Sequence, residues 1–456
     1  MVIKIFNTLT RKKEELKPHK GKQINMFVCG PTVYDLSHIG HAKTYVQFDV
    51  IAKYLRYRGY DVFYLQNITD IDDKIIRRGE ENKEEPLKLA HRFESEYLKD
   101  MVALGIDSVT KYARATDYIK QIIKQIKTLI EKGYAYEMDD GVYFEIEKFK
   151  EYGKLSHQPM DQIKEGARVS VNENKRGPSD FSLWKKQKPG EPFWESPWGK
   201  GRPGWHIEDT AITETEFGPQ YDLHGGGMDL IFPHHESEIA QMEASSGKKP
   251  FVKYWLHTAF LNINKQKMAK SLGNFLTIRE SLNKWDGKTY RFYYATTHYR
   301  TPLDYSDENV NQAKQGLERI NEFIRKVKIA DGKENSKIAG LIKKTKTAFE
   351  KHMDDDFDMP LAIASVYDFI REVNKLDIGK KNNKDIISFL KELDEVLCFM
   401  TFDEEKVPKE IMALVDKREK ARKDKDWATS DKMRDELKKK GYYVDDTPQG
   451  AVVKKL

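Results

Sequence analysis

Two histidines near the start of the chain have a spacing that suits phosphate chemistry. His38 and His41 follow a short apolar run that ends at Gly30, and a helical pattern begins near Gly40. A helix that starts at such a turn presents free N–H groups and the positive end of its dipole, which favour a phosphate. Two imidazoles can also donate hydrogen bonds to a phosphoryl group as its negative charge grows. By itself, the pair is better explained as two surface histidines beside a turn.

A second candidate lies much further along the chain and carries two lysines. Lys267, Met268, Lys270 and Ser271 have the pattern of a loop with cations three positions apart. A mobile loop of this kind can close over a triphosphate and neutralise the leaving pyrophosphate. A lysine loop alone is usually only a solvated loop. Its combination with the histidine pair predicts an ATP site in which the two histidines and the two lysines are catalytic.

Three further residues have the chemistry of metal ligands. His234 and Glu238 are four positions apart on a predicted helix, so their side chains share one face. Cys29 comes at a predicted strand end. Thiolate, imidazole and carboxylate are typical ligands of zinc. From the residues alone, a buried structural cysteine, a capping histidine and a solvated glutamate explain them better.

The segments around these candidates predict the elements that must position them. Residues 23–29 have the pattern of a buried strand, 40–57 that of a helix and 61–69 that of a second strand. Strand, helix and strand in this order form a βαβ unit, so we expect a parallel, nucleotide-binding type of sheet. The sheet pattern resumes at residues 221–233 and is followed by a helix over 235–245.

The remaining segments differ in composition. Residues 141–203 are rich in Gly, Pro, Trp and Lys, which predicts an insertion with long loops. Amphipathic helices are expected between residues 86 and 133. Residues 308–402 have an all-helical pattern, with a clear helix over 360–374. The charged end predicts one long helix over about 409–440, followed by a small strand-like tail.

Composition limits the classes of function. The net charge of +6 permits a polyanionic partner but does not require one. The two cysteines, Cys29 and Cys398, cannot form a disulfide framework, which favours a reducing compartment. The sequence shows no apolar leader and no run of about 18 apolar residues, so we expect a cytoplasmic protein with no membrane span.

Longer motifs around the candidates resemble a known family. The runs CGPTVYD, HIGHAKTYVQFDV, NITDIDDKI, GRPGWHIE and HGGGMDLIFPHHESEIAQ, in this order, are similar to the cysteinyl-tRNA synthetases, which are class I aminoacyl-tRNA synthetases. The resemblance extends nearly end to end, through HYRTPLDYS, DDDFDMPLAIA, KDWATSDKMRDEL and DDTPQG. It implies a monomeric cysteine–tRNA ligase. Such an enzyme uses ATP with Mg²⁺ to activate L-cysteine as its adenylate and then charges tRNA(Cys).

The resemblance implies an α/β fold with several domains. A Rossmann-type parallel-sheet catalytic domain with an insertion would be followed by a helical anticodon-binding domain and a small α+β tail that binds tRNA. The expected ranges are 1–120 and 204–262 for the two catalytic halves, 121–203 for the insertion, 263–307 for the lysine-loop region, 308–402 for the helical domain and 403–456 for the tail.

In this family a zinc ion selects the substrate thiol, because a pocket that reads shape alone separates cysteine poorly from serine. The resemblance places zinc on Cys29, His234 and Glu238. The usual fourth ligand is a cysteine after the motif WHIE, but Asp209 stands there in this chain. Carboxylate oxygen can ligate zinc, so we expect Asp209 to complete the set. Lower-ranked substitutes are His206, His224 and His235.

Other roles follow from the resemblance alone. The amino-acid pocket would contain Cys29, Gly30, Thr69 and Trp205. The ATP site would contain His38, Gly40, His41, Gly225, Gly226, Gly227, Asp229, Lys267, Met268, Lys270 and Ser271. Glycines let the backbone come close to a ligand, although a turn beside a buried strand is an alternative explanation of the glycine run.

The basic end of the chain suggests contacts to RNA. We predict Arg418 and Arg422 as phosphate-binding residues and Trp427 as a base-stacking residue. Acidic residues interleave with the basic ones, so charge alone favours a solvated helix, with Trp427 in a core. The family resemblance instead favours an RNA-binding role for the segment as a whole.

Three other functions compete with this interpretation. A relative that joins cysteine to a sugar amine would lack the full tail that this chain has. A non-catalytic nucleotide- or RNA-binding paralogue would have lost motif residues, whereas the histidine pair and both lysines are present. A class I synthetase for another amino acid would not need Cys29 together with His234 and Glu238.

Overall fold

The computed structural model describes residues 2–159, 175–268, 273–403, 408–447 and 450–455. The chain divides into two compact units, residues 1–400 and 401–456, and each is described by itself. Within the described ranges, no helix combines the length and the apolar character needed to cross a bilayer.

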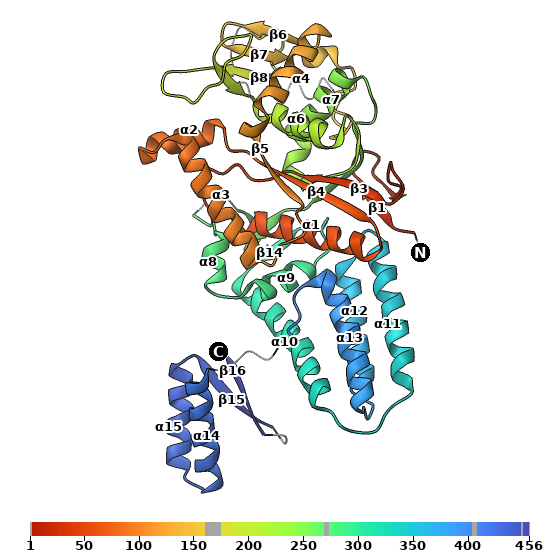
Figure 1. The fold of residues 1–456 in the computed structure, drawn as a ribbon, viewed down its shortest axis with the longest axis vertical. Helices are drawn as coiled ribbons and strands as arrows, with labels where there is room; N and C mark the ends of the chain where they lie inside the picture. Colours follow the sequence, from red (N-terminus) through yellow and green to blue (C-terminus); the bar gives the residue numbers. More distant parts are fainter. Residues whose placement is uncertain (1, 160–174, 269–272, 404–407, 448–449, 456) are drawn as a thin grey trace. The chain divides into compact units, whose positions relative to one another are not determined.

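A five-stranded parallel sheet forms the centre of the first unit (Figure 1). The strand order is β11-β10-β3-β4-β5. These strands are β3 (Gln23–Val28), β4 (Asp61–Ile68), β5 (Lys111–Arg114), β10 (Tyr221–Gly227) and β11 (Val252–Thr258). Helix α1 (Ile39–Tyr57) connects β3 to β4, which confirms the predicted βαβ unit. From β3 the chain continues to β4 and β5 along one edge direction of the sheet, whereas β10 pairs with β3 on its opposite edge. Parallel sheets of this type bind ligands at such a reversal, beyond the carboxyl ends of the strands.

Helices cover both faces of this sheet (Figure 1). Helix α1 lies on one face, and α4 (Ile119–Glu131), α6 (Trp205–Phe217) and α7 (Glu236–Ser246) lie on the other. Helix α4 forms because its isoleucines and leucine recur at helical spacing and give it one apolar face. The apolar core on this side also receives Cys29, so the thiol lies between the sheet and α6 and α7.

The insertion contains a second sheet. Strands β6 (Ala135–Met138), β7 (Gly141–Phe144), β8 (Phe181–Lys186) and β9 (Gly201–Pro203) pair antiparallel in chain order. The expectation of long loops is wrong for these residues. Gly201 serves close strand packing, since a Cβ there would lie 2.3 Å from the carbonyl oxygen of Lys185, whereas Gly190 and Gly199 adopt a positive φ between the strands.

Strand β5 also interrupts the region expected to be only helices. It separates α3 (Pro86–Ala103) from α4, which follows a short 3₁₀ turn, η1 (Ala115–Tyr118). Four residues at a sheet edge are too few to show an alternating pattern in the sequence.

The rest of the first unit is mainly helical. The all-helical pattern after residue 308 is confirmed, and the helix expected at 360–374 is α12. The helices are α2 (Asp73–Asn82), α8 (Ile278–Leu282), α9 (Gly287–Ala295), α10 (Asp307–Ile329), α11 (Lys337–Asp354), α12 (Met359–Val373) and α13 (Lys380–Leu397). The short strands are β1 (Lys4–Asn7), β2 (Lys12–Glu15), β12 (Leu261–Ile263), β13 (Gln266–Lys267) and β14 (Leu303–Tyr305).

The second unit is a helix hairpin with a strand hairpin. Its elements are α14 (Lys409–Lys423), α15 (Trp427–Lys439), β15 (Tyr442–Thr447) and β16 (Gly450–Lys455). The prediction of one long helix is wrong because the chain reverses at residues 424–426. Lys425 has a φ of 59°, and the side chain of Asp426 caps α15 by accepting a hydrogen bond from the N–H of Thr429. The strand-like tail is confirmed.

Candidate active site and metal centre

His38 is the N-cap of α1. Its Nδ1 accepts hydrogen bonds from the backbone N–H groups of Gly40 at 3.1 Å and His41 at 3.3 Å, while Ile39 donates to the carbonyl of Leu276 at 3.1 Å. The first N–H groups of this helix are therefore already bonded, and the expectation that they are free for a phosphate is wrong. Because Nδ1 accepts, the proton of the neutral ring is on Nε2, which makes that nitrogen a donor.

The His41 ring stacks on the His38 ring, with centroids 3.8 Å apart. Desolvation, followed by the nearby His38 and Lys74, lowers the pKa of His41 well below its ordinary value. The ring is therefore neutral near pH 7. Neutral imidazoles can donate hydrogen bonds to an anionic group without a protonation step.

The segment after the lysine loop lies beside the histidine pair. Thr277 forms a bridge with His38, and Ile278 donates a backbone hydrogen bond to Ser37 at 2.9 Å. Met268 reaches the same place, because its Cε lies 3.3 Å from the position that a Cβ on Gly40 would occupy. Lys267 is paired through its backbone in β13. Lys270 and Ser271 lie outside the described residues.

The expected metal-ligating residues converge at the C-terminal end of β3. Cys29 follows this strand, Asp209 comes from α6, and His234 and Glu238 come from the turn before α7 and from α7 itself. One ligand atom of each lies within 4.8 Å of all the others, and all four residues are buried. Nε2 of His234 is 3.0 Å from Oδ2 of Asp209 and 3.0 Å from Oε1 of Glu238, and Sγ of Cys29 is 3.6 Å from Oδ2 of Asp209. A tetrahedral zinc ion separates its ligand atoms by about 3.5 Å.

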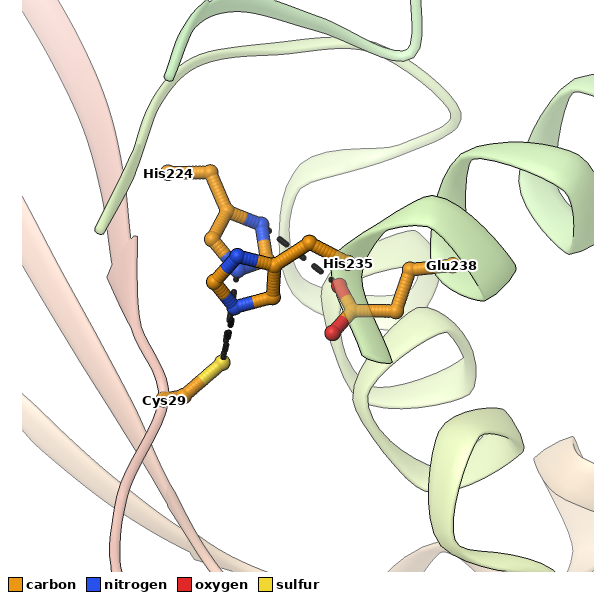
Figure 2. A group of neighbouring side chains, drawn as sticks. All are labelled: Cys29, His224, His235 and Glu238. Atoms are coloured by element: carbon orange, nitrogen blue, oxygen red, sulfur yellow. Dashed lines mark hydrogen bonds and ion pairs between the residues drawn. The ribbon is translucent and has the colours of Figure 1, made fainter. Parts of the chain in front are cut away.

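Two of the lower-ranked histidines form a second set with the same cysteine and glutamate (Figure 2). Sγ of Cys29 lies 3.1 Å from Nε2 of His235 and 3.4 Å from Nε2 of His224. The other ring nitrogen of His224 contacts the Tyr221 hydroxyl at 2.7 Å, and that of His235 contacts His257 at 2.8 Å. The third histidine, His206, contacts Nδ1 of His234 at 2.8 Å and so orients the His234 ring from the side away from the cluster.

The electrostatics of this cluster fit a cation. Both carboxylate oxygens of Glu238 are buried, and although Oε1 lies 3.0 Å from Nε2 of His234 and Oε2 lies 3.6 Å from Nδ1 of His224, neither oxygen forms a hydrogen bond with a described residue. Burial, then the charges of Glu238 and Asp209, raise the pKa of the Cys29 thiol well above its ordinary value, and burial and Asp209 raise the pKa of Glu238. Three acidic groups buried together are unfavourable without a positive charge, and a divalent metal reverses this field.

The expected pocket residues surround the cluster. The Trp205 ring stacks on the His234 ring, with centroids 4.2 Å apart. Trp205 itself is 38% exposed. Thr69 is buried after β4 and donates to Oε1 of Glu208 at 2.8 Å. Gly30 passes so close to β4 that a Cβ there would lie 1.7 Å from the carbonyl oxygen of Asn67. A larger residue at position 30 would therefore force the backbone of this segment and β4 apart.

The glycine run forms the C-terminal end of β10, beside β3. A Cβ on Gly225 would lie 2.4 Å from the Phe48 ring, and one on Gly226 would lie 2.8 Å from the His235 ring. Packing within the chain therefore already requires glycine at these two positions. Gly227 leads into the 3₁₀ turn η3 (Met228–Leu230), where Asp229 is exposed.

The candidate RNA-binding residues lie on the helix hairpin of the second unit. Trp427 begins α15 and is 59% exposed, so it is not in a core. Arg422 is half-buried near the end of α14. Arg418 is buried, and its guanidinium donates to Glu419 at 2.6 Å.

The parallel sheet, the histidine pair at the start of α1 and the adjoining lysine segment define a class I aminoacyl-tRNA synthetase. The model of the class I (C) tRNA synthetase catalytic domain matches residues 15–315, the DALR domain matches 348–401, and the cysteinyl-tRNA ligase anticodon-binding domain matches 404–452. The chain belongs to the cysteine–tRNA ligase family. It is therefore a ligase that forms an aminoacyl-tRNA bond.

The sequence similarity to known relatives extends over nearly the whole chain. The cysteine–tRNA ligase of Thermoplasma volcanium is 50% identical and covers 97% of each chain, and that of Thermococcus onnurineus is 46% identical and covers 100% of each. Among solved structures, a Mycobacterium tuberculosis methionyl-tRNA synthetase in complex with methionyl-adenylate has a TM-score of 0.60 at 16% identity. The match covers 83% of this chain and 88% of that one, and it shows the shared fold.

Sequence reasoning missed several residues that position the cluster. Asn67, Tyr221 and His257 all contact predicted ligands or their substitutes. Asn67 lies within the family motif NITD, two positions before Thr69, and this was the one available signal. Tyr221 and His257 have no distinctive local pattern.

Proposed function

We propose that this protein activates L-cysteine with ATP, giving cysteinyl-adenylate and pyrophosphate, and then transfers cysteine to the 3′ end of tRNA(Cys). The observation that carries this proposal is the buried group formed by Cys29, Asp209, His234 and Glu238. Its donors are those of a zinc site, and it lies at the carboxyl end of the sheet, where such folds bind ligands.

The four residues would hold one zinc ion. When bound, the metal supplies an open coordination position that takes the sulfur of cysteine far better than the hydroxyl of serine. Cys29, Asp209 and Glu238 contribute the negative charge that offsets the cation. Trp205 and Thr69 flank the group and would form the walls around the substrate side chain.

The histidine pair and the lysine loop would act on ATP. Nε2–H of His38 is oriented by the cap that Nδ1 makes, so it can donate to a phosphate oxygen. Lys267 and Lys270 would neutralise the pyrophosphate, together with Mg²⁺. The substrate carboxylate would attack the α-phosphate in line, and the enzyme contributes position and charge stabilisation. Gly227 and Asp229 would lie on the adenosine side.

A second ligand set has its own support. His224 and His235 approach the sulfur of Cys29 more closely than Asp209 does, and each has its far nitrogen fixed by a partner. We favour the set with Asp209 because a cation bound there would contact all three buried acidic groups, Cys29, Asp209 and Glu238, and offset their charge. Replacing His234 with Asn should lower zinc content below about a tenth of the wild-type level, whereas His224→Asn should leave most of it. The reverse result would assign the metal to the second set.

The reaction is tested by ATP–pyrophosphate exchange and by charging of tRNA(Cys). Cysteine should drive exchange, and Lys270→Ala should reduce it roughly 100-fold while cysteine affinity stays near normal. Lys265→Ala is the matched control, because Lys265 is exposed in the same region and belongs to no motif. Unchanged exchange in Lys270→Ala would remove the loop from the reaction. No exchange by a folded, zinc-loaded wild-type protein would favour a binding protein.

A further inference from the structure

Asn67 is a buried amide that connects two of the proposed metal ligands. It lies on β4 and is 2% exposed. Its Oδ1 accepts a hydrogen bond from the N–H of Gly30, the residue after Cys29, at 2.5 Å. Its Nδ2 donates to Oδ1 of Asp209 at 2.6 Å and to Oγ1 of Thr69 at 3.3 Å. Because the N–H of Gly30 can only donate, the amide must present its nitrogen to Asp209.

The two carboxylate oxygens of Asp209 therefore face different neighbours. Oδ1 accepts from Asn67, whereas Oδ2 lies 3.0 Å from Nε2 of His234 and 3.6 Å from Sγ of Cys29. A cation placed among these ligand atoms would meet Oδ2 alone. A cysteine has one ligand atom and no second acceptor that Asn67 could hold separately, so this division depends on a carboxylate at position 209.

Building on the metal set proposed above, we propose that Asn67 is a positioning residue that holds Asp209 for coordination through one oxygen. Without Nδ2 the buried Oδ1 would lose its donor, and the carboxylate could rotate away from the metal position. Hydrogen bonds that orient a ligand in this way typically change metal affinity roughly 10- to 100-fold. The importance of Asn67 should therefore depend on which residue occupies position 209.

This dependence is tested with four full-length proteins: wild type, Asn67→Ser, Asp209→Cys and the double variant. The zinc dissociation constant of each is measured by competition with a chromophoric chelator. Asn67→Ser should weaken zinc binding at least tenfold when residue 209 is aspartate, and less than about threefold when it is cysteine. The visible spectrum of bound Co²⁺, which reports coordination geometry, should change with Asn67 only in the aspartate background.

Three results would overturn the proposal. An equal loss in both backgrounds would mean that Asn67 acts only through Gly30 and the sheet. No loss in either background would remove Asn67 from metal binding. A wild-type protein that binds no zinc would instead refute the metal set itself, and the chelator competition with the wild type separates this case from the other two.

Loss of the fold is controlled by a second substitution. If thermal unfolding shows that Asn67→Ser does not fold, Asn67→Asp replaces it in the same four-protein comparison. This change keeps an acceptor for the N–H of Gly30 and removes the donor to Asp209. Zinc binding should again weaken at least tenfold with aspartate at position 209 and less than about threefold with cysteine there, and equal effects would contradict the proposal.

Discussion

At the scale of single residues, the two cysteines provide a matched test of the proposed metal site. Cys29 faces acidic and histidine side chains, whereas Cys398 ends α13 and contacts Lys53 at 3.0 Å. Cys29→Ser should reduce zinc from about one ion per chain to less than about a tenth, because serine is a poor zinc ligand. Cys398→Ser should leave zinc content unchanged. Metal analysis of both dialysed proteins checks this, and equal zinc in the two would rule out Cys29 as a ligand.

Lys43 gives a pH dependence of stability that can be measured directly. It is buried on α1, where Nζ donates to the carbonyl of Ala259 at 2.7 Å, and burial lowers its pKa to about 7. Between about pH 7 and its ordinary value of 10.5, the unfolded chain binds a proton that the folded chain does not. The stability difference between wild type and Lys43→Met should therefore shift toward the wild type as pH rises, by up to about 1.4 kcal/mol per pH unit.

Denaturant unfolding of both proteins at several pH values measures this difference. The difference in unfolding free energy between the two proteins removes the contributions of all groups that titrate equally in both. Parallel stability curves would mean that Lys43 stays charged in the folded protein.

At the scale of elements, the start of α1 gives His38 a structural role as the helix cap, beside the catalytic role proposed for it. His38→Ala removes the cap and should lower the free energy of unfolding by about 1 kcal/mol. His38→Asn retains a strong cap residue and should cost less. Both should reduce ATP–pyrophosphate exchange roughly 100-fold, since neither supplies the Nε2–H donor. Near-normal exchange in His38→Asn would show that His38 matters only as a cap.

Elements with strong periodic patterns could be predicted from the sequence. Strand β3, helix α1 and strand β4 lie within about a residue of expectation because each is apolar at the proper spacing. The break between α14 and α15 was missed because neither Gly nor Pro marks it, and Lys425 adopts its positive φ within a charged run. The strands β6 to β9 were missed because each is short and their glycines resembled loop signals.

The candidate site was predictable in its residue types but not in its geometry. Family motifs pointed to Cys29, Asp209, His234 and Glu238, and the structure brings them together. The approach of His224 and His235 to the same sulfur depends on how the turn before α7 lies against β10, where the centroids of the two histidine rings are 4.4 Å apart. The contact of Asn67 with Asp209 joins positions that are 142 residues apart. Local sequence patterns carry no information on such contacts.

At the scale of the whole molecule, the two units should separate amino-acid activation from tRNA binding. Stacking of a base on an exposed aromatic ring is worth about 1–3 kcal/mol. Trp427→Ala should therefore raise the KM for tRNA(Cys) roughly tenfold in charging assays. ATP–pyrophosphate exchange, which needs no tRNA, should stay unchanged. Met412→Ala removes another exposed apolar side chain of the same unit, 41% exposed, and should alter neither activity.

Equal effects of Trp427→Ala and Met412→Ala on charging would contradict a stacking role. A loss of exchange in Trp427→Ala would mean that the second unit contributes to activation itself.

The central claim is that a zinc ion on Cys29, Asp209, His234 and Glu238 selects cysteine, with a carboxylate where the family usually has a thiolate. The most direct measurement is the zinc content of the purified protein together with cysteine- and serine-dependent ATP–pyrophosphate exchange on the same sample, before and after zinc is removed by a chelator. We expect one zinc ion per chain, a strong preference for cysteine, and loss of that preference when zinc is removed. Cysteine selectivity that persists without zinc would contradict the account and would assign discrimination to other contacts in the pocket.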